Sequence, residues 1–358
     1  MPKEIYPDFA KLTQKILNTT DTQVFVLTTH LGADFDDFSS LVAFLDYLNH
    51  LKPSLETHIC LSGELDPKYL ALTPSSSFFW KDSDFADFTD YFKADFNDKN
   101  IYLSVFGCSD LKRTLGNPYT QAIYQTFNGQ TNFQTISFDH HIQGEAWADY
   151  NFVDDQASSN AENLLDVLFQ QPNFRISPDT ATNLMIGLVS DTVNFFASST
   201  TNLTHKHAGE LMNLGCNIAL VRAIIHEKWT VENLSRLNDL ILKTEYLDTS
   251  TLTWHKDNLN TSFAVLDCGL DSEIPNLFSN EILDILKTQI VIMVKVGTGP
   301  KDRKLSIRCL PESPLNAVDL ASHFGGGGHR LAAGGSIGNH DINWFKGELV
   351  QFLKKSKI

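Results

Sequence analysis

The sequence predicts an α/β protein: an N-terminal parallel-sheet domain with helices on both faces, a helical connector and a smaller C-terminal α/β domain. Two observations indicate this fold class. Short β-branched and aromatic runs alternate with helical patterns through the first two hundred residues, as expected for a parallel sheet between two helical layers. Strand signals then return after a long helical stretch. A chain of 358 residues with 42% apolar content can bury two cores.

The elements of the first domain follow from hydrophobic periodicity and from the residues that end each run. Ser177-Pro178 marks a helix start, and Gly215 marks a helix stop. The stretch 82–98, rich in Asp and Phe, is interpreted as an amphipathic helix with its Phe face packed inward. The alternative for this stretch is an acidic tract that collects metal ions. The predicted strands are residues 23–29, 57–61, 101–106 and 133–138, with a helix at 38–48.

The second domain is predicted from renewed strand and helix patterns near the C-terminus. Strands are expected at 262–266, 290–296 and 304–309, and helices at 318–324 and 343–354. We therefore expect three parts, with boundaries at 1–215, 216–258 and 259–358.

Charge and cysteine content narrow the function classes. The chain has 28 basic and 43 acidic residues, and this net charge of −15 disfavours duplex nucleic acid and membrane attachment but leaves small anionic ligands open. Its 5 cysteines form no C-x-x-C pair, so neither a disulfide framework nor a thiolate zinc site is indicated. The first 17 residues carry charges where a signal peptide would be apolar, and the sequence has no apolar run of ~20 residues. We expect a cytoplasmic protein.

Candidate metal ligands follow the first predicted strand. His30, Asp34 and Asp36 lie in THLGADFDD, where one tight turn presents an imidazole and two carboxylates. Ligands collect at the carboxyl ends of strands in open parallel sheets, and mixed nitrogen and oxygen donors suit Mn²⁺ and related divalent ions. The alternative is a solvated loop without a ligand, because such a string also arises by chance.

Further candidates follow later elements. Asp139, His140 and His141 come directly after a predicted strand, where core packing does not explain adjacent histidines. Asp191 lies in the apolar helical run MIGLVSDTVNF, where a buried carboxylate needs a partner of opposite charge, such as a metal ion. The alternative for Asp191 is a helix-end carboxylate paired with backbone amides.

The segment FGGGGHRLAAGG predicts an anion-binding turn. Its glycines, Gly327 and Gly328 among them, would let backbone amides close on a phosphate, and His329 would donate a hydrogen bond. The Ala-rich stretch that follows is expected to begin a helix whose N-terminus adds positive charge. Arg308, on the predicted strand 304–309, would add a bidentate phosphate contact. The alternatives are a flexible turn and an exposed edge-strand charge.

Four motifs in order resemble the Asp-His-His (DHH) phosphoesterases with their associated C-terminal domain. They are H-x-x-x-D-x-D with Ser40 four places beyond Asp36, then D-H-H, then G-x-x-x-D-T at 187–192, then G-G-G-H. The resemblance spans about residues 23 to 338, and four motifs in this order are highly specific. Stretches such as NFVDDQASSNAE and SDTVNFFASST are similar to the bacterial nano-RNase and phosphoadenosine-phosphatase branch of that family.

The resemblance implies a catalytic first domain with two divalent ions, usually Mn²⁺, and Mg²⁺ as the alternative. One ion would be held by His30 and Asp34, and the other by Asp36, His140 and Asp191. Asp139 and His141 would be catalytic, with His141 facing the substrate phosphate. The C-terminal domain would bind substrate. The implied substrate contacts are Ser40, Arg308, Gly327, Gly328 and His329.

One departure from the family pattern concerns the strand 101–106. Family members place at its end an Asp that bridges both ions, whereas this chain has Gly107 or Cys108 there. Two divalent ions ~3.7 Å apart repel by roughly 18 kcal/mol at an effective dielectric constant of ~20, so the loss of a shared anion is not neutral. Either Asp110 reaches in, or a hydroxide or substrate phosphate bridges, or one metal binds, or catalysis is lost. Cys108 as a thiolate ligand would favour a softer metal.

We therefore expect metal-dependent hydrolysis of phosphate esters of small nucleotides: short oligoribonucleotides, linear dinucleotides or 3′-phosphoadenosine 5′-phosphate. The missing Asp leaves the alternative of a catalytically degenerate homologue that binds a nucleotide without chemistry. A second alternative, which uses the same N-terminal motifs, is a pyrophosphatase or exopolyphosphatase. The expected partner is a small nucleotide or short single-stranded oligonucleotide, with no duplex and no membrane; a homodimer is left open.

Overall fold

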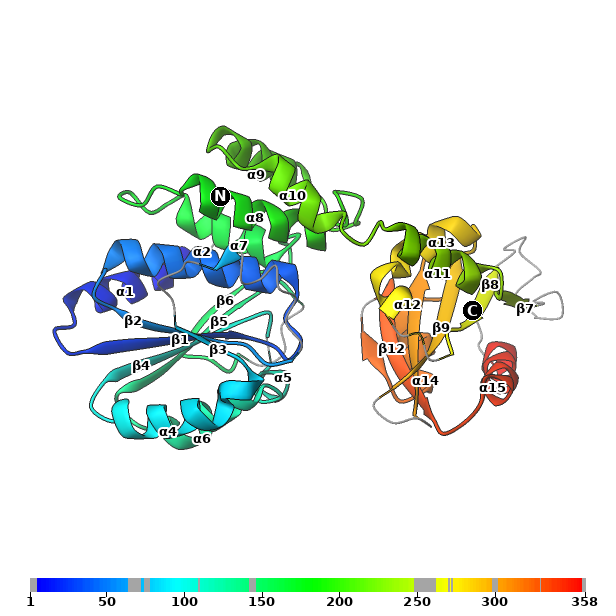
Figure 1. The fold of residues 1–358 in the computed structure, drawn as a ribbon, viewed down its shortest axis with the longest axis horizontal. Coiled ribbons are helices and arrows are strands. Elements are labelled where there is room, and N and C mark those ends of the chain that lie inside the picture. Colours follow the sequence, from blue (N-terminus) through cyan, green and yellow to red (C-terminus); the bar gives the residue numbers. More distant parts are fainter. Residues whose placement is uncertain are drawn as a thin grey trace. The chain divides into compact units, whose positions relative to one another are not determined.

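The computed structural model describes residues 5–63, 72–73, 78–108, 110–141, 146–247, 262–269, 271, 273–297, 302–328 and 330–355. The chain divides into two compact units, Met1–His226 and Glu227–Ile358, and each contains a six-stranded sheet (Figure 1). The predicted α/β class, with a parallel-sheet domain followed by a smaller α/β domain, is confirmed. None of the helices in these ranges combines the length and the apolar character that crossing a lipid bilayer requires.

The sheet of the first unit has the strand order β3-β2-β1-β4-β5-β6, with every neighbouring pair parallel. Its strands are β1 Gln23–Thr29, β2 Glu56–Cys60, β3 Phe78–Trp80, β4 Asn100–Phe106, β5 Phe133–Asp139 and β6 Tyr150–Val153. The chain runs outward from β1 to β3 and then returns to form β4 on the other side of β1. In parallel sheets this reversal is where ligands bind, at the carboxyl ends of the two central strands.

Helices cover both faces of this sheet (Figure 1). One layer comprises α1 Ile5–Asn18, α2 Phe35–Leu51, α7 Asn160–Leu168 and α8 Pro178–Asp191, and the other α4 Phe85–Asp95 and α6 Pro118–Phe127. Side chains alternate between the faces of each strand, so Phe25 and Leu27 of β1 join one core, and Val24 and Val26 the other.

Helix α2 lies between the sheet and α8, and it is buried along most of its length. Its first turn carries Asp36 and Asp37, which are 2% and 1% exposed. Because the helix is covered on both sides, these two carboxylates are removed from water at the carboxyl edge of the sheet.

The predicted helix start at Ser177-Pro178, the predicted helix stop at Gly215 and the predicted apolar helix face in 82–98 are confirmed. Ser177 caps α8 by accepting a hydrogen bond from the backbone of Thr180, with Pro178 at the first helical position. Gly215, with φ of +89°, follows the end of α9 Asn202–Asn213. In α4, Phe88 and Phe92 are buried, as predicted for the stretch 82–98. The short helix α5 Leu111–Thr114 and the helices α10 Ile218–Ile225 and α11 Val231–Ile241 complete the described α-helices up to residue 247, and a 3-10 turn, η1 Asp82–Asp84, precedes α4.

The sheet of the second unit is mixed, with the order β11-β12-β10-β9-β8-β7 and one parallel pair, β8 with β9. Its strands are β7 Glu245–Leu247, β8 Phe263–Asp267, β9 Ile290–Val296, β10 Arg303–Cys309, β11 Gly327–Gly328 and β12 Ala332–Gly338. Its helices are α12 Glu273–Leu277, α13 Ser279–Leu286, α14 Ala317–His323 and α15 Ile342–Lys355. The strands predicted at 262–266, 290–296 and 304–309 and the helices predicted at 318–324 and 343–354 are confirmed within one residue.

The prediction of a helix after the glycine turn is wrong, because the Ala-rich segment forms strand β12. Small residues allow close pairing here: a Cβ atom on Gly326 would lie 1.9 Å from the carbonyl oxygen of Gly334. Gly327 and Gly328 pair with Gly334 and Ala333 as the short strand β11. The turn therefore precedes a strand, and no helix N-terminus follows it to add positive charge.

We predict that Gly187→Ala destabilises the protein by about 1–3 kcal/mol, because the added methyl overpacks the contact between α8, α2 and α7. A Cβ atom at position 187 would lie 2.9 Å from Asp36 Oδ1 and 3.0 Å from the Cβ of Ala161. The matched control is Gly209→Ala in α9, where a Cβ would meet nothing within 4 Å, so a gain of about 0.5–1 kcal/mol is expected. Urea denaturation of both variants measures the difference, and equal stabilities would contradict it.

Candidate metal centre

Polar side chains converge at the carboxyl edge of the parallel sheet. His30 directly follows β1, Gly107 follows β4, and Asp139 ends β5. The register pairs Thr29 with Phe106 and Phe106 with Phe138, so these three strand ends lie level with one another. The N-terminus of α2 and the C-terminus of α8 bring further carboxylates to the same edge.

The first group of potential ligands consists of His30, Asp34 and Asp37, which offer atoms within 4.8 Å of one another. His30 Nε2 lies 3.6 Å from Asp34 Oδ2 and 3.2 Å from Asp37 Oδ2. The other ring nitrogen, Nδ1, is 2.8 Å from the carbonyl oxygen of Leu31, which fixes the ring orientation. Burial disfavours the charged ring, but the nearby carboxylates of Asp34 and Asp37 outweigh it and raise the pKa of His30 to about 10.

The second group consists of Asp36, His140 and Asp191. His140 Nε2 lies 3.8 Å from Asp36 Oδ2 and 3.5 Å from Asp191 Oδ2. Both oxygens of Asp36 also accept hydrogen bonds from the backbone N–H groups that open α7, those of Asn160 at 2.6 Å and Ala161 at 2.9 Å. Burial and the charge of Asp191 nevertheless raise the pKa of Asp36, and burial and Asp34 raise the pKa of Asp191 to about 7.

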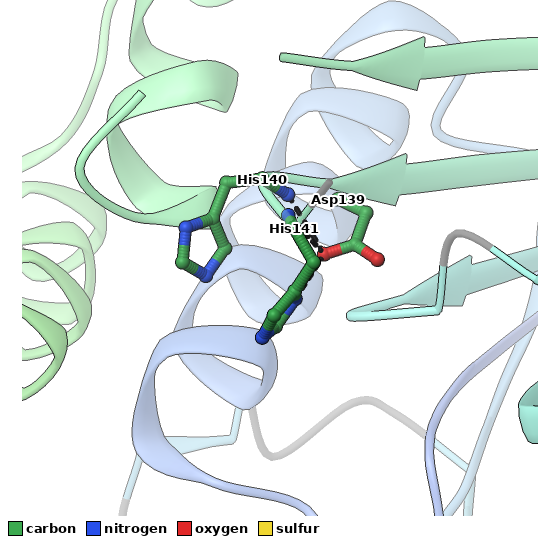
Figure 2. Close-up of side chains that lie close together, drawn as sticks. All are labelled: Asp139, His140 and His141. Atoms are coloured by element: carbon green, nitrogen blue, oxygen red, sulfur yellow. Dashed lines mark hydrogen bonds and ion pairs between the residues drawn. The ribbon is translucent and has the colours of Figure 1, made fainter. Parts of the chain in front are cut away.

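The third group is the D-H-H motif itself, drawn in Figure 2. Asp139 Oδ1 accepts hydrogen bonds from the backbone of His140 at 2.7 Å and of His141 at 3.1 Å, and it lies 2.6 Å from His141 Nδ1. Burial alone would raise the pKa of Asp139, but the hydrogen bond and the charge of His141 hold it at about 2. The two rings leave the end of β5 in different directions, so His141 is oriented by Asp139 while His140 faces the second group.

These residues fit a divalent cation. Asp37 Oδ2 and Asp139 Oδ2 are buried and accept no hydrogen bond, a deficit of about 1–3 kcal/mol for each atom unless a positive charge satisfies it. The donors are imidazole nitrogens and carboxylate oxygens with no sulfur among them, a set suited to Mn²⁺ and, with more oxygen ligands, to Mg²⁺. The geometry therefore provides two adjacent ligand groups with an excess of negative charge.

The structure groups His30 with Asp34, and Asp36 with His140 and Asp191, as the family resemblance implied. Asp110 has another role: its Oδ1 accepts a hydrogen bond from the backbone of Arg113 at 2.8 Å and so caps α5. It belongs to none of the ligand groups found among the described residues.

Two other expectations for this domain are corrected. Burial raises the pKa of the Cys108 thiol to about 12, and Cys108 belongs to none of the ligand groups found among the described residues. The thiol instead packs in the core between the sheet and the layer of α4 and α6. Ser40 is fully buried within α2, and its hydroxyl is therefore not presented to a substrate in this structure.

The substrate-contact candidates of the second unit lie around β10 and β11. Arg308 is half-buried on β10, where its Nη1 donates to the carbonyl oxygen of Ile307 at 3.0 Å. Gly327 and Gly328 are exposed and form β11. His329 lies outside the described residues.

Asp37 is the residue of the centre that the sequence patterns did not identify. The H-x-x-x-D-x-D motif ends at Asp36, so the next Asp was left without a role. A signal was nonetheless present, because an additional carboxylate stands at the start of α2 in a chain that lacks one after β4.

We predict that Asp191→Asn increasingly stabilises the metal-free protein relative to the wild type as the pH rises from 5 to 8. The pKa of Asp191 is raised to about 7, so its contribution to stability is complete below about pH 4 and is lost as the pH rises through 7. Asparagine does not titrate, so the variant lacks this pH-dependent loss of stability. Thermal unfolding in EDTA measures the difference in melting temperature between variant and wild type. The control is Asp179→Asn, an exposed position at the other end of α8, for which this difference is expected to be the same at every pH. An Asp191→Asn difference that does not change with pH would contradict this.

Comparisons with known proteins agree with the motif order. No family model matches the chain. An uncharacterized protein of Mycoplasma genitalium is 25% identical over 329 residues, covering 92% of this chain and 90% of that protein. The bifunctional oligoribonuclease and PAP phosphatase NrnA of Bacillus subtilis is 26% identical over 211 residues, covering 58% of this chain and 63% of that protein.

Among solved structures, an exopolyphosphatase-related protein from Bacteroides fragilis has the same fold. Its TM-score is 0.76 at 17% identity, with 98% of this chain and 96% of that chain covered. The four motifs in order and the NrnA relative support the resemblance to the Asp-His-His phosphoesterases, and the solved structure shows the same fold.

Proposed function

We propose that this chain hydrolyses phosphate esters of small nucleotides and depends on Mn²⁺, or alternatively Mg²⁺, to do so. The observation that carries the proposal is the pair of adjacent nitrogen and oxygen ligand groups at the carboxyl edge of the sheet, next to an oriented His141. In this proposal His30 and Asp34 hold one cation, and Asp36, His140 and Asp191 hold the other. A divalent cation neutralises phosphate oxygens on which charge builds during hydrolysis.

The chain's own residues would position the phosphate and manage a proton. His141 is held through Nδ1 by Asp139, and in this proposal its Nε2 donates a hydrogen bond to a phosphate oxygen. The buried, ionised Asp139 raises the pKa of His141, which keeps the ring protonated to a higher pH. A protonated ring is the better donor to an anionic substrate.

The proposed substrate class is taken from the relative NrnA, a bifunctional oligoribonuclease and PAP phosphatase. We therefore propose short oligoribonucleotides, linear dinucleotides and 3′-phosphoadenosine 5′-phosphate as the first substrates to test. The second domain would hold the nucleotide or its terminal phosphate through Arg308, Gly327, Gly328 and His329. An arginine fork matches two phosphate oxygens, and exposed glycine amides allow close approach of an anion.

A catalytically degenerate nucleotide-binding protein is the second candidate, and Gly107 in place of the family's Asp favours it. The first ligand group weighs against it, because that group already contains two carboxylates and an imidazole. Pyrophosphatase or exopolyphosphatase activity is the third candidate, and a substrate panel separates it from the first.

We predict Mn²⁺-dependent turnover of a 5′-phosphorylated dinucleotide and of 3′-phosphoadenosine 5′-phosphate, abolished by EDTA and slower or absent with pyrophosphate and polyphosphate. The panel is followed by phosphate release and by chromatography of the nucleotides. Turnover of none of these compounds would support the degenerate candidate, and turnover of pyrophosphate alone would support the third.

We further predict that His141→Gln lowers kcat at least about 100-fold, as expected for loss of a proton-donating group, while Mn²⁺ affinity stays within a few-fold. The control is His50→Gln in the last turn of α2, where an exposed ring hydrogen-bonds the carbonyl of Asn173. Steady-state kinetics and Mn²⁺ titration of both variants test this. Loss of metal binding in His141→Gln, or an unchanged kcat, would remove the proposed role.

A further inference from the structure

The backbone at the end of β4 leaves no room for a side chain, because a carboxylate from another element already fills that space. A Cβ atom on Gly107 would lie 1.8 Å from Asp37 Oδ2, 2.3 Å from its Cγ and 2.5 Å from its Oδ1. Gly107 also has φ of +75°, a conformation in which glycine is favoured. Position 107 and Asp37 therefore compete for one volume, and the carboxylate of Asp37 occupies it.

The contacts of Asp37 hold one oxygen and leave the other for a cation. Asp37 is 1% exposed, and its Oδ1 accepts a hydrogen bond from Asn160 Nδ2 at 3.3 Å. The same Asn160 donates its backbone N–H to Asp36 Oδ2, so one residue fixes both neighbouring carboxylates. Oδ2 lies 3.2 Å from His30 Nε2 but accepts no aligned hydrogen bond. A buried oxygen in this state is costly unless it is bound to a positive charge.

Asp37 is close to both ligand groups. It shares the first group with His30 and Asp34. It also lies beside Asp36 of the second group, because Asn160 hydrogen-bonds Asp37 Oδ1 through its side chain and Asp36 Oδ2 through its backbone N–H. A carboxylate placed between the two groups can contact two cations at once.

We propose that Asp37, reaching from the first turn of α2, replaces the carboxylate that family members carry after β4 and serves as the ligand shared by two cations. This inference rests on the proposed two-cation centre. It assigns the missing negative charge to a residue that lies outside the family motifs. In this proposal the carboxylate has moved from position 107 to position 37. Position 107 must then be glycine, because any side chain there would overlap the carboxylate of Asp37.

Mn²⁺ binding to the purified, metal-free protein tests this directly. Titration calorimetry counts the ions and gives each affinity, and electron paramagnetic resonance detects the exchange coupling of two Mn²⁺ ions that share a ligand. The wild type is expected to bind two coupled ions. The nearly isosteric variant Asp37→Asn is expected to lose the coupled signal and to bind the second ion at least 100-fold more weakly. Asp46→Asn, further along α2 where Asp46 accepts a hydrogen bond from Thr180, is the matched control and keeps both ions.

The exchange itself gives a sharper test. Gly107→Asp alone is expected to weaken Mn²⁺ binding and lower the melting temperature, because two carboxylates then contend for one space. Combining it with Asp37→Ala empties that space, and the double variant is expected to recover the second ion to within about 10-fold of the wild type. Asp is among the residues that tolerate a positive φ, so position 107 can accept it. Gly107→Asp is thus expected to weaken Mn²⁺ binding when residue 37 is Asp and to strengthen it when residue 37 is Ala.

The outcomes separate this inference from the function on which it rests. A wild type that binds two ions, with an Asp37→Asn variant that binds them equally tightly and remains coupled, overturns the role of Asp37 and leaves the proposed function standing. A wild type that binds one ion or none overturns the two-cation centre and this role with it. Recovery of the coupled pair in the double variant supports the exchange whether or not Asp37→Asn folds well.

Discussion

Negative charge withdrawn from water is the constraint on which the candidate centre depends. Asp36, Asp37 and Asp139 are all nearly or fully buried at one edge of the parallel sheet. Each has partial compensation: Asp36 accepts two backbone N–H groups of α7, Asp37 accepts from Asn160, and Asp139 is paired with His141. The remaining charge is not balanced by a lysine or arginine among the described contacts of these carboxylates, so cations are the physical complement of the site.

The topology explains why the charge accumulates at this place. The strand order reverses between β1 and β4, so the loops that follow them diverge and leave the carboxyl edge accessible. Helix α2 starts there and points its N-terminus at the same edge, which brings three acidic residues within one helical turn. Glycine at position 187 allows α8 to approach α2 closely enough that Asp191 meets His140. The ligand groups thus depend on helix packing as much as on the loops that carry the motifs.

Much of the fold followed from local signals, and the failures have physical causes. Strands β1 and β9 were predicted to the residue because they are continuous β-branched or apolar runs, whereas β3 has three residues and gives no comparable signal. The segment that forms β12 was misassigned because alanine favours a helix, whereas its pairing with β10 is a tertiary effect that overrides this preference. The candidate ligands in the motifs were identified from the order of the motifs. Asp37 was missed because its direction toward Gly107 is set by how α2 packs on the sheet, which no sequence period encodes.

The central claim is that two cations share the carboxylate of Asp37. A crystal grown with Mn²⁺ and measured at the manganese absorption edge addresses it most directly, because the anomalous signal locates each ion independently of the protein model. The account predicts two peaks ~3.5–4 Å apart, with the oxygens of Asp37 between them at metal–oxygen bonding distances of roughly 2.0–2.6 Å. A single peak, or a pair in which Asp37 contacts neither ion, would contradict it.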